Sequence, residues 1–341
     1  MVSKAINNLV VDLKPREREV LVGRFGLDDG ERKTLAALGE KYGITRERVR
    51  QIENDGLNLL NKKLQDELIS RVLNQAISHL ENVGGLRQED YFLNDLRYLL
   101  GDKNLNYWHL QFLFEVNGKP HYYNEDDDFH GFWYLDDKNL KQAVGLIDRL
   151  IRFLEQKKEE LLNQRKFEIV LTRFIEPHPV PDFIALNYVL ISKNFGTNPF
   201  GDFGLRNWGE INPKTIRHKA YLIMKRYGQP MHFAEIAQAI NKVGFDKRKA
   251  LPQTVHNELI KYPEFILVGR GLYGLKDFGF VSGASRDIIK NILKLKGPLP
   301  FDKIVDLVSL QRHIKKGTIA LHLSNKKHFK KLPNGKYSVI R

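Results

Sequence analysis

The chain has 341 residues, contains no cysteine and carries a formal net charge of +14 at neutral pH. This length predicts roughly two to four domains rather than one core. The absence of cysteine excludes disulfides and thiolate metal sites. No apolar run is long enough to cross a bilayer and the first residues lack a signal-peptide pattern, so we expect a cytoplasmic protein that does not bind membranes.

The charge is unevenly distributed along the chain. Residues 1–64 carry about +3, residues 65–210 about −7 and residues 211–341 about +18. Basic segments attract nucleic acid by releasing its condensed counterions, whereas an acidic segment is repelled by it. We therefore expect double-stranded DNA to contact the two ends of the chain.

The N-terminal residues 1–12 are expected to form only a short apolar lead-in. Pro15 then stands at the first position of a predicted amphipathic helix. Val20, Leu21 and Phe25 recur at helical spacing in it and are expected to face a core. Glycines at both ends of residues 26–30 predict a turn after this helix.

Residues 34–64 have the pattern of a helix-turn-helix. Thr34 can cap a first helix, Gly43 can adopt the positive φ that ends it, and Thr45 can cap a second helix after a short turn. At 3.6 residues per turn, the apolar positions of the second helix fall on one side. The predicted buried stripe consists of Val49, Ile52, Gly56 and Leu60.

The opposite face of the second helix is polar and is the first candidate DNA-binding site. Arginine suits guanine, glutamine and asparagine suit adenine, glutamate suits the cytosine amino group, and spare cations suit phosphates. The alternative is a solvated face laced with charge pairs one turn apart, but the turn in front of the helix favours DNA binding. The candidate residues are Arg46, Glu47, Arg48, Arg50, Gln51 and Asn54.

With residues 13–33, this block resembles region 4 of sigma-70-type sigma factors, the module that binds the promoter −35 element. The runs RFGLDDGE (residues 24–31) and TRERVRQIE (residues 45–53) carry the resemblance. The resemblance implies base contacts by Arg46, Glu47 and Gln51, with Arg50 facing the phosphates.

Two departures from the family pattern stand in this block. Ala36 and Ala37 occupy positions where the family usually has acidic residues. Gly56 replaces a helix-favouring residue. Because glycine inside a helix costs about 1 kcal/mol relative to alanine, we expect the far end of the second helix to be looser than in a typical member.

Residues 65–138 predict a degenerate, acidic winged helix. The periodic pattern through Leu68, Val72, Ala76 and Leu80 indicates helical structure that ends at Gly84 and Gly85. Further segments then predict two helices followed by a hairpin. Their expected bounds are residues 87–100 and 107–116 for the helices, and residues 121–124 and 131–135 for the strands.

The tip of this hairpin, residues 125–128, is acidic and is flanked by His121 and His130. Oxygen ligands of this kind suit hard cations, so a divalent-metal site is one interpretation. The other is a solvated acidic loop, which we favour because no glycine-centred ligand spacing is present. We therefore predict no metal site.

Residues 139–211 predict a long helix followed by a small aromatic unit. The helix is expected over residues 139–165, with Val144, Ile147, Ile151 and Leu154 on one face. A proline-rich segment at residues 176–183, a helix at 184–193 and a small hairpin within 194–211 follow. The hairpin residues could stack on bases, but without interleaved basic residues we expect them in a core. They are Phe195, Phe200, Phe203, Leu205 and Trp208.

Residues 212–280 predict a winged helix. Helices are expected over residues 213–227, 232–242 and 251–262, before a strand, a turn and a strand in 264–275. The runs PMHFAEIA and GRGLYGL resemble the HARE-type helix-turn-helix, found in the delta subunit of RNA polymerase and appended to chromatin and restriction proteins. The resemblance implies a winged-helix fold and nucleic-acid contact, although family members also bind proteins.

By winged-helix geometry, the third helix of this segment, the residues before it and the hairpin tip form the second candidate DNA-binding site. The alternative for this patch is a surface that only confers solubility. The candidate residues are Lys247, Arg248, Lys249, Gln253, Thr254, His256, Asn257 and Arg270.

Residues 281–341 repeat the same order of elements and predict a second, basic winged helix at the C-terminus. Helices are expected over residues 286–296 and 317–324, and a hairpin over 328–340 turns at residues 333–335. Lysine is a point charge, so its lysines are expected to contact phosphates without specifying sequence. They are Lys315, Lys316, Lys326, Lys327, Lys330, Lys331 and Lys336.

The expected fold is mainly α and multi-domain, with an N-terminal helix-turn-helix followed by winged-helix modules with small β-hairpins. No nucleotide-binding loop, nucleophile elbow or HExxH motif is present, so we expect no catalytic residue, no cofactor and no enzymatic activity. The expected domains are residues 1–64, 65–138, 139–211, 212–280 and 281–341.

These features favour a DNA-binding transcription regulator that contacts a −35-like duplex, with basic winged helices adding affinity. No segment resembles sigma region 2, so we do not expect this chain to initiate transcription unaided. One alternative is an accessory subunit of RNA polymerase, since region 4 of sigma factors also docks on the β-subunit flap. Another is a DNA-modification or defence-associated DNA-binding protein, suggested only by where HARE-type modules occur.

Overall fold

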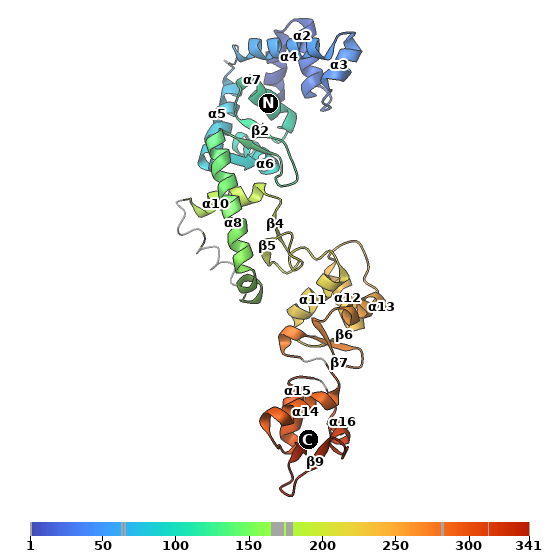
Figure 1. Ribbon diagram of the computed structural model, residues 1–341. Helices are drawn as coiled ribbons and strands as arrows, with labels where there is room; N and C mark the ends of the chain where they lie inside the picture. The colour runs from blue at the N-terminus through green and yellow to red at the C-terminus, as the bar shows by residue number, and fades with distance from the viewer. Residues whose placement is uncertain are drawn as a thin grey trace. The chain divides into compact units, whose positions relative to one another are not determined.

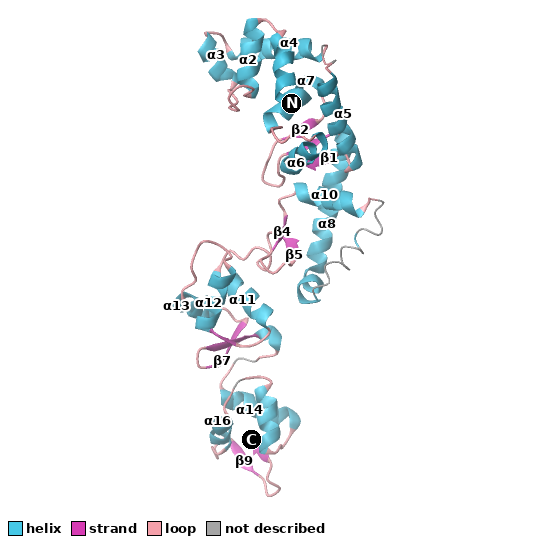
Figure 2. Ribbon diagram, turned by 180° about the vertical axis from the view of Figure 1, so that it is seen from behind, coloured by secondary structure: helices cyan, strands magenta, loops and turns pink. Residues whose placement is uncertain are grey.

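The computed structural model describes residues 2–62, 64, 66–164, 174, 180–280, 283–312 and 314–340. Two compact units, Met1–Gly196 and Thr197–Arg341, are described separately below. Helices predominate, and the strands form only small two- or three-stranded sheets (Figure 2). The predicted mainly α, multi-domain fold is confirmed. Within the described ranges, no helix is long and apolar enough to span a bilayer.

The first unit begins with a helix, α1 (Val2–Val11), where we expected only a lead-in. The expectation was wrong because Val2, Ile6 and Val10 recur every four residues and are buried on one face. That face packs against helices that lie much later in the chain. The next helix, α2 (Pro15–Phe25), starts at Pro15 as predicted.

The predicted helix-turn-helix is present as α3 (Leu35–Tyr42) and α4 (Arg46–Asn61). The Thr34 hydroxyl accepts a hydrogen bond from the Ala37 amide at 3.1 Å, and the Thr45 hydroxyl accepts one from the Arg48 amide at 3.1 Å. Gly43 ends α3 with a φ of +66°. Both predicted caps and the predicted turn glycine are therefore confirmed. The core of this motif consists of Val20, Leu38, Val49 and Ile52.

A winged helix follows in the order helix, strand, helix, helix, strand, strand. Its antiparallel sheet has the strand order β1-β3-β2. The helix predicted from residue 87 starts two residues later because Arg87 and Gln88 pair with β3 instead. The elements are α5 (Glu67–Asn82), β1 (Leu86–Gln88), α6 (Glu89–Leu100), α7 (Tyr107–Asn117), β2 (His121–Tyr123) and β3 (Phe132–Tyr134).

Helices α1 and α2 and the end of α4 share a second, larger hydrophobic core with this winged helix, and this core runs from α1 to β3. Phe25 of α2 packs edge-to-face on Phe112 of α7, with ring centroids 5.3 Å apart. Leu60 near the end of α4 is fully buried in the same core. Figure 1 shows α7 directly beside α4 and α2. The five-segment division of the chain stays a prediction, and its first two segments are packed together.

Among the described residues, the first unit also contains the helices α8 (Asp137–Gln164) and α10 (Asp182–Ile191). The predicted long helix is confirmed over its described length. Its predicted stripe is partly wrong, because Val144 and Ile151 are only half-buried. Contacts with β3 and α10 set the buried face instead. Residue 165 and residues 176–179 of the proline-rich segment lie outside the described residues. The buried residues of α8 include Ala143, Leu146, Ile147, Leu150 and Leu154.

Helix α10 is held against the turn between α5 and β1 by Asn187, which is 3% exposed. Its amide donates to the carbonyls of Val83 at 2.8 Å and Leu86 at 2.6 Å, and its oxygen accepts from Arg87 at 2.9 Å. At Gly84, where φ is +90°, an added Cβ would lie 2.4 Å from Ile184. The turn therefore needs glycine for both its conformation and its close contact with α10.

Asp95 on α6 predicts an acid-dependent loss of stability. It accepts hydrogen bonds from His79 and Arg87, both at 2.8 Å. Burial raises the pKa of Asp95, but these bonds outweigh burial and hold the pKa below its usual 3.8. The stabilisation is therefore present above the ordinary aspartate pKa and is lost as the pH falls through the folded-state value.

Urea unfolding of the wild-type protein can be measured at several pH values between 7 and 3. The urea concentration at the midpoint for the first unit should decrease once the pH is below about 4. The Asp95→Asn variant should start from a lower midpoint and lose less on acidification. Parallel profiles for the two proteins would contradict this assignment.

The second unit begins within the hairpin of β4 (Phe195–Thr197) and β5 (Phe203–Leu205), and the elements after this hairpin repeat the winged-helix order. Its first helix starts at Ile216 rather than at Pro213 as predicted, because the Thr215 hydroxyl caps the His218 amide at 3.2 Å. The sheet has the order β6-β8-β7. The elements are α11 (Ile216–Tyr227), β6 (Met231–His232), α12 (Phe233–Val243), α13 (Pro252–Lys261), β7 (Phe265–Gly269) and β8 (Leu272–Leu275).

The C-terminal segment has the same order a third time within the described residues. Leu299 pairs with Tyr337 as an isolated bridge in the place of the first strand. The turn between the last two strands is closed by the Gly335 amide, which donates to the Leu332 carbonyl at 2.9 Å. The elements are α14 (Ser285–Lys296), α15 (Phe301–Ser309), α16 (Lys316–Leu323), β9 (Phe329–Lys331) and β10 (Tyr337–Val339).

Candidate nucleic-acid interface

The two faces of α4 are those predicted from the sequence. Its buried side is made by the four predicted residues of the stripe, and its opposite side is open to solvent. The separation of faces is thereby confirmed, while the DNA contacts of the exposed residues stay a prediction. The exposed residues are Arg46, Glu47, Arg48, Arg50, Gln51 and Asn54.

Several of these side chains are already paired along the helix. Arg50 donates to the Glu47 carboxylate at 2.6 and 2.9 Å, and Arg48 donates to Gln51 at 3.0 Å. The bond from Arg50 holds the pKa of Glu47 below its usual value, so the carboxylate remains an acceptor at neutral pH. Exposed pairs of this kind contribute little to stability, so DNA can replace them at small cost.

Helix α4 is anchored from its inner side by α2. Arg24 donates to Glu53 at 3.0 Å and to the Lys33 carbonyl at 3.3 Å, which joins α2, the following loop and α4. A Cβ at Gly56 would lie 2.9 Å from Leu21 of α2. Gly56 therefore permits a close helix crossing, and α4 continues unbroken through it to Asn61.

Gly39 is a residue of the motif that the sequence analysis missed. A Cβ at this position would lie 2.7 Å from the carbonyl oxygen of Ile44, in the turn between α3 and α4. A side chain there would push the second helix away from the first. The available signal was a glycine inside a helical pattern, four residues before the glycine of the turn.

Substituting Gly39 and Gly145 separately with alanine should have opposite effects. Both lie inside helices, and alanine is favoured over glycine there by about 1 kcal/mol. At Gly145 the nearest atom to a Cβ is 3.5 Å away, so Gly145→Ala should raise the urea midpoint of the first unit. Gly39→Ala should lower it, because overpacking costs roughly 1–3 kcal/mol. Equal shifts of the urea midpoint in the two variants would show that the turn between α3 and α4 tolerates a side chain at position 39.

The third helix of the first winged helix, α7, is covered by the helix-turn-helix. Six of its eleven residues are buried. Arg32, from the loop after α2, donates to Gln111 at 2.7 Å, and Asn61 of α4 donates to the Val116 carbonyl at 2.6 Å. In this fold, α7 is therefore a docking surface for α2 and α4 and is not open to DNA.

The hairpin tip of the same winged helix is acidic and tied down locally. Glu125 pairs with Lys193 at 2.6 Å, and Asp126 accepts from the Tyr123 hydroxyl at 2.7 Å. The latter bond lowers the pKa of Asp126. No group of three or more potential metal-ligating side chains occurs in the described part of the chain.

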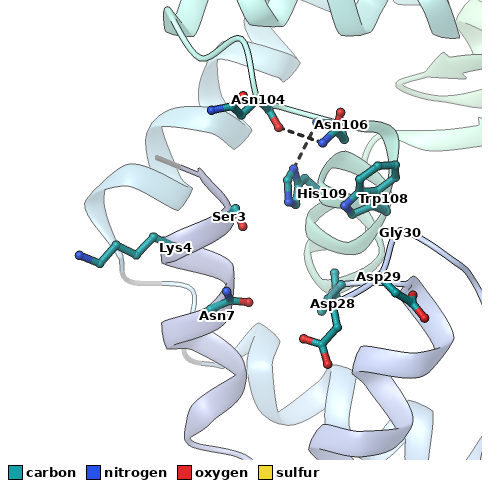
Figure 3. Close-up of a pocket in the computed structure, with 11 residues that line it drawn as sticks. Ser3, Lys4, Asn7, Asp28, Asp29, Gly30, Asn104, Asn106, Trp108 and His109 are labelled. Atoms are coloured by element: carbon teal, nitrogen blue, oxygen red, sulfur yellow. Dashed lines mark hydrogen bonds between the residues drawn. The ribbon is translucent and has the colours of Figure 1, made fainter.

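A cavity of about 560 Å³ lies at the seam between the helix-turn-helix and the first winged helix. Figure 3 shows its walls, which come from α1, the loop after α2, the loop before α7 and the first turn of α7. His109 accepts a hydrogen bond from the Asn106 amide at 3.2 Å, and burial lowers the pKa of His109. Lys4 extends away from the cavity (Figure 3). The cavity thus belongs to the interface that joins the two motifs.

The second predicted site has exposed members and one half-buried member. His256 is half-buried and stacks on Phe233 with ring centroids 4.5 Å apart, and its DNA contact stays a prediction. Gln253 donates to Asn257 at 3.0 Å on the outer side of α13. The exposed members are Lys247, Arg248, Lys249, Gln253, Thr254, Asn257 and Arg270.

The loop before α13 is shaped by an ion pair between a buried lysine and an exposed aspartate, which was not predicted from the sequence. Lys219 of α11 is 2% exposed and donates to Asp246 at 2.6 Å. The Arg248 amide donates to the other Asp246 oxygen at 3.0 Å. The bond from Lys219 lowers the pKa of Asp246, which keeps the carboxylate ionised. The basic residues 247–249 therefore follow a fixed turn.

Comparison with known families gives a match at each of the two helix-turn-helix segments. Residues 9–62 match the family model described as sigma-70, region 4. Residues 214–278 match the HARE-HTH family model, whose description includes the restriction endonuclease HTH domain. Both predicted resemblances are confirmed. The two matched segments are α2 to α4 with their flanks, and the first winged helix of the second unit.

Curated relatives align with a limited part of this chain. The sigma factor SigA of Microcystis aeruginosa is 41% identical over 68 residues, which is 20% of this chain and 16% of that protein. SigA of Clostridium acetobutylicum is 44% identical over 73 residues, which is 20% of this chain and 19% of that protein. The principal sigma factor HrdD of Streptomyces coelicolor is 41% identical over 64 residues, or 19% of each chain. The chain therefore spans less than a fifth of the length of these three relatives.

Proposed function

We propose that this protein is a DNA-binding transcription regulator that contacts a −35-like duplex through α4. The observation that carries the proposal is the exposed polar face of a capped helix in a segment matching sigma-70, region 4. Its chemistry suits the major groove, where arginine, glutamine and glutamate distinguish base pairs. The protein acts by binding rather than by catalysis.

The exposed side chains divide into two roles under this proposal. Arg46, Glu47 and Gln51 contact base edges, while Arg48 and Arg50 neutralise phosphates. Asn54 lies just under one turn beyond Gln51 on the same helix and contacts the edge of the groove. The HARE-type winged helix adds contacts from α13, and the basic residues 211–341 add affinity for any duplex.

Fluorescence anisotropy of labelled duplexes tests this proposal with the intact chain. One duplex carries a −35 element of a sigma-70-type promoter, and the other carries the same bases scrambled within that element. Each correct base contact is worth about 1–3 kcal/mol, so the intact element should bind at least about tenfold more tightly at 0.15 M salt. Equal affinities would overturn the assignment of a −35-like target.

A second function is supported by the names of the relatives, which are sigma factors of RNA polymerase. Under this proposal the protein is an RNA polymerase accessory subunit, and its region 4-like segment contacts the β-subunit flap. The test is retention of purified core RNA polymerase by the immobilised chain. Retention that survives Arg46→Ala with Gln51→Ala supports the accessory role, and no retention by the wild-type chain contradicts it.

A further inference from the structure

The three winged-helix segments of this chain differ in the side chains that their third helix and hairpin expose. In the first, the third helix is covered and the hairpin tip is acidic. In the second, the third helix exposes amide and hydroxyl side chains, namely Gln253, Thr254 and Asn257. In the third, α16 and the hairpin that follows it expose lysines. The last of these surfaces is outside both matched families.

The acidic residues of the C-terminal segment are confined to its first two helices. Residues 307–340 contain no aspartate or glutamate, whereas the acidic residues of this segment, Asp287, Asp302 and Asp306, all lie on α14 and α15. The third helix and the hairpin therefore have no carboxylate of their own with which to form ion pairs. This absence leaves an uncompensated positive surface, which favours a polyanionic partner.

The lysines of this surface are all exposed. The Lys331 ammonium lies 5.7 Å from the centroid of the Tyr337 ring, at the base of the hairpin. No ion pair involves these lysines within the described residues. They are Lys315, Lys316, Lys326, Lys327, Lys330, Lys331 and Lys336.

Helix α16 lacks arginine, amide and carboxylate side chains, which make many of the specific contacts to base edges. Its sequence KGTIALHL contains no arginine, asparagine, glutamine, aspartate or glutamate. Gly317 and Ala320 are exposed and short, so the helix backbone can approach a groove closely. The lysine side chains lie at the first turn of α16 and on the hairpin that follows it. This arrangement suits phosphates on both sides of a groove and carries little sequence information.

We propose that α16 and the β9–β10 hairpin form a sequence-independent clamp on the phosphate backbone of duplex DNA. This inference rests on the proposed DNA-binding function and adds a third site to those on α4 and α13. Each lysine that neutralises a phosphate releases condensed counterions, so the site contributes affinity that falls steeply with salt. The contribution is equal for every sequence, because the contacts are point charges.

The test measures duplex affinity of the full chain at several salt concentrations. The test variant carries Lys316→Gln, Lys330→Gln and Lys336→Gln. The control carries Lys294→Gln, Lys296→Gln and Lys303→Gln on α14 and α15, and loses the same net charge. Each phosphate contact contributes about 0.9 to the slope of log affinity against log salt, so the test variant should lose about two to three units of slope.

The test variant should also bind intact and scrambled duplexes roughly 10- to 100-fold more weakly at 0.15 M salt, by the same factor for both. The control should change far less, and replacing the same three lysines with arginine should retain the wild-type slope. Equal losses in test and control, or an unchanged slope in the test variant, would overturn the clamp. A wild-type chain that binds no duplex would instead contradict the proposed function itself.

Discussion

Replacing Arg46 and Gln51 together with alanine is expected to lower affinity for the preferred duplex by at least about 30-fold. Each well-aligned contact to a base edge is worth about 1–3 kcal/mol, and 1.4 kcal/mol corresponds to a tenfold change in affinity. Both side chains are exposed on α4, so their loss leaves no cavity. The remaining arginines of α4 and the basic residues 211–341 keep their phosphate contacts, so binding to a scrambled duplex should change only severalfold.

The matched control is Arg71→Ala with Gln75→Ala on α5. These two residues are of the same types, are also exposed and lie on a helix of the same unit. The control should retain both affinity and preference. If both double variants lose affinity equally, the effect is general electrostatics and α4 has no special role. If neither loses preference, the base contacts lie elsewhere.

Replacing Asn187 with alanine is expected to lower the free energy of unfolding of the first unit by roughly 3 kcal/mol. The substitution leaves the buried carbonyls of Val83 and Leu86 without this donor, and Arg87 without this acceptor. A buried polar group that loses its partner costs about 1–3 kcal/mol. Helix α10 should detach from the turn at Gly84 and Gly85 first.

Urea unfolding followed by tryptophan fluorescence measures this effect. Trp108 and Trp133 lie in the first unit and Trp208 in the second, so a Trp208→Phe background reports on the first unit alone. Asn74→Ala on the exposed side of α5 is the control and should shift the midpoint little. A midpoint for Asn187→Ala within the range of this control would show that α10 is held by apolar packing instead.

The helix-turn-helix could be predicted in detail because its signals are local. Thr34 and Thr45 cap helices within three residues of themselves, and Gly43 meets a conformational need of the turn that contains it. The buried stripe of α4 follows from helical periodicity alone. The winged-helix order of the second unit was likewise predicted from its sequence of helices and strands.

Features that depend on distant partners were missed or misplaced. The burial of α7 depends on α2 and α4, which lie some 50 or more residues away along the chain. Its sequence YWHLQFLFEVN is apolar around most of its surface, which is a signal of burial on several sides. The stacking of His256 on Phe233 was not predicted, because the position of a residue in a helix does not show which distant side chain it contacts.

The charge pattern was informative about function but not about packing. It predicted an acidic middle and basic ends, and the acidic hairpin tip at residues 125–128 is exposed. It did not predict that α1 and α7 join the helix-turn-helix to the acidic winged helix in one core. That core is formed by apolar contacts between distant residues, and composition does not show which of these residues contact each other.

The measurement that tests the central claim most directly is selection of bound duplexes from a random pool at about 0.15 M salt. The wild-type chain, the Arg46→Ala, Gln51→Ala variant and the Arg71→Ala, Gln75→Ala control are selected in parallel. A short motif enriched by the wild type and the control, and absent with the α4 variant, is the expected result. Pools that stay unenriched, or the same motif from all three proteins, would contradict the claim that α4 contacts bases.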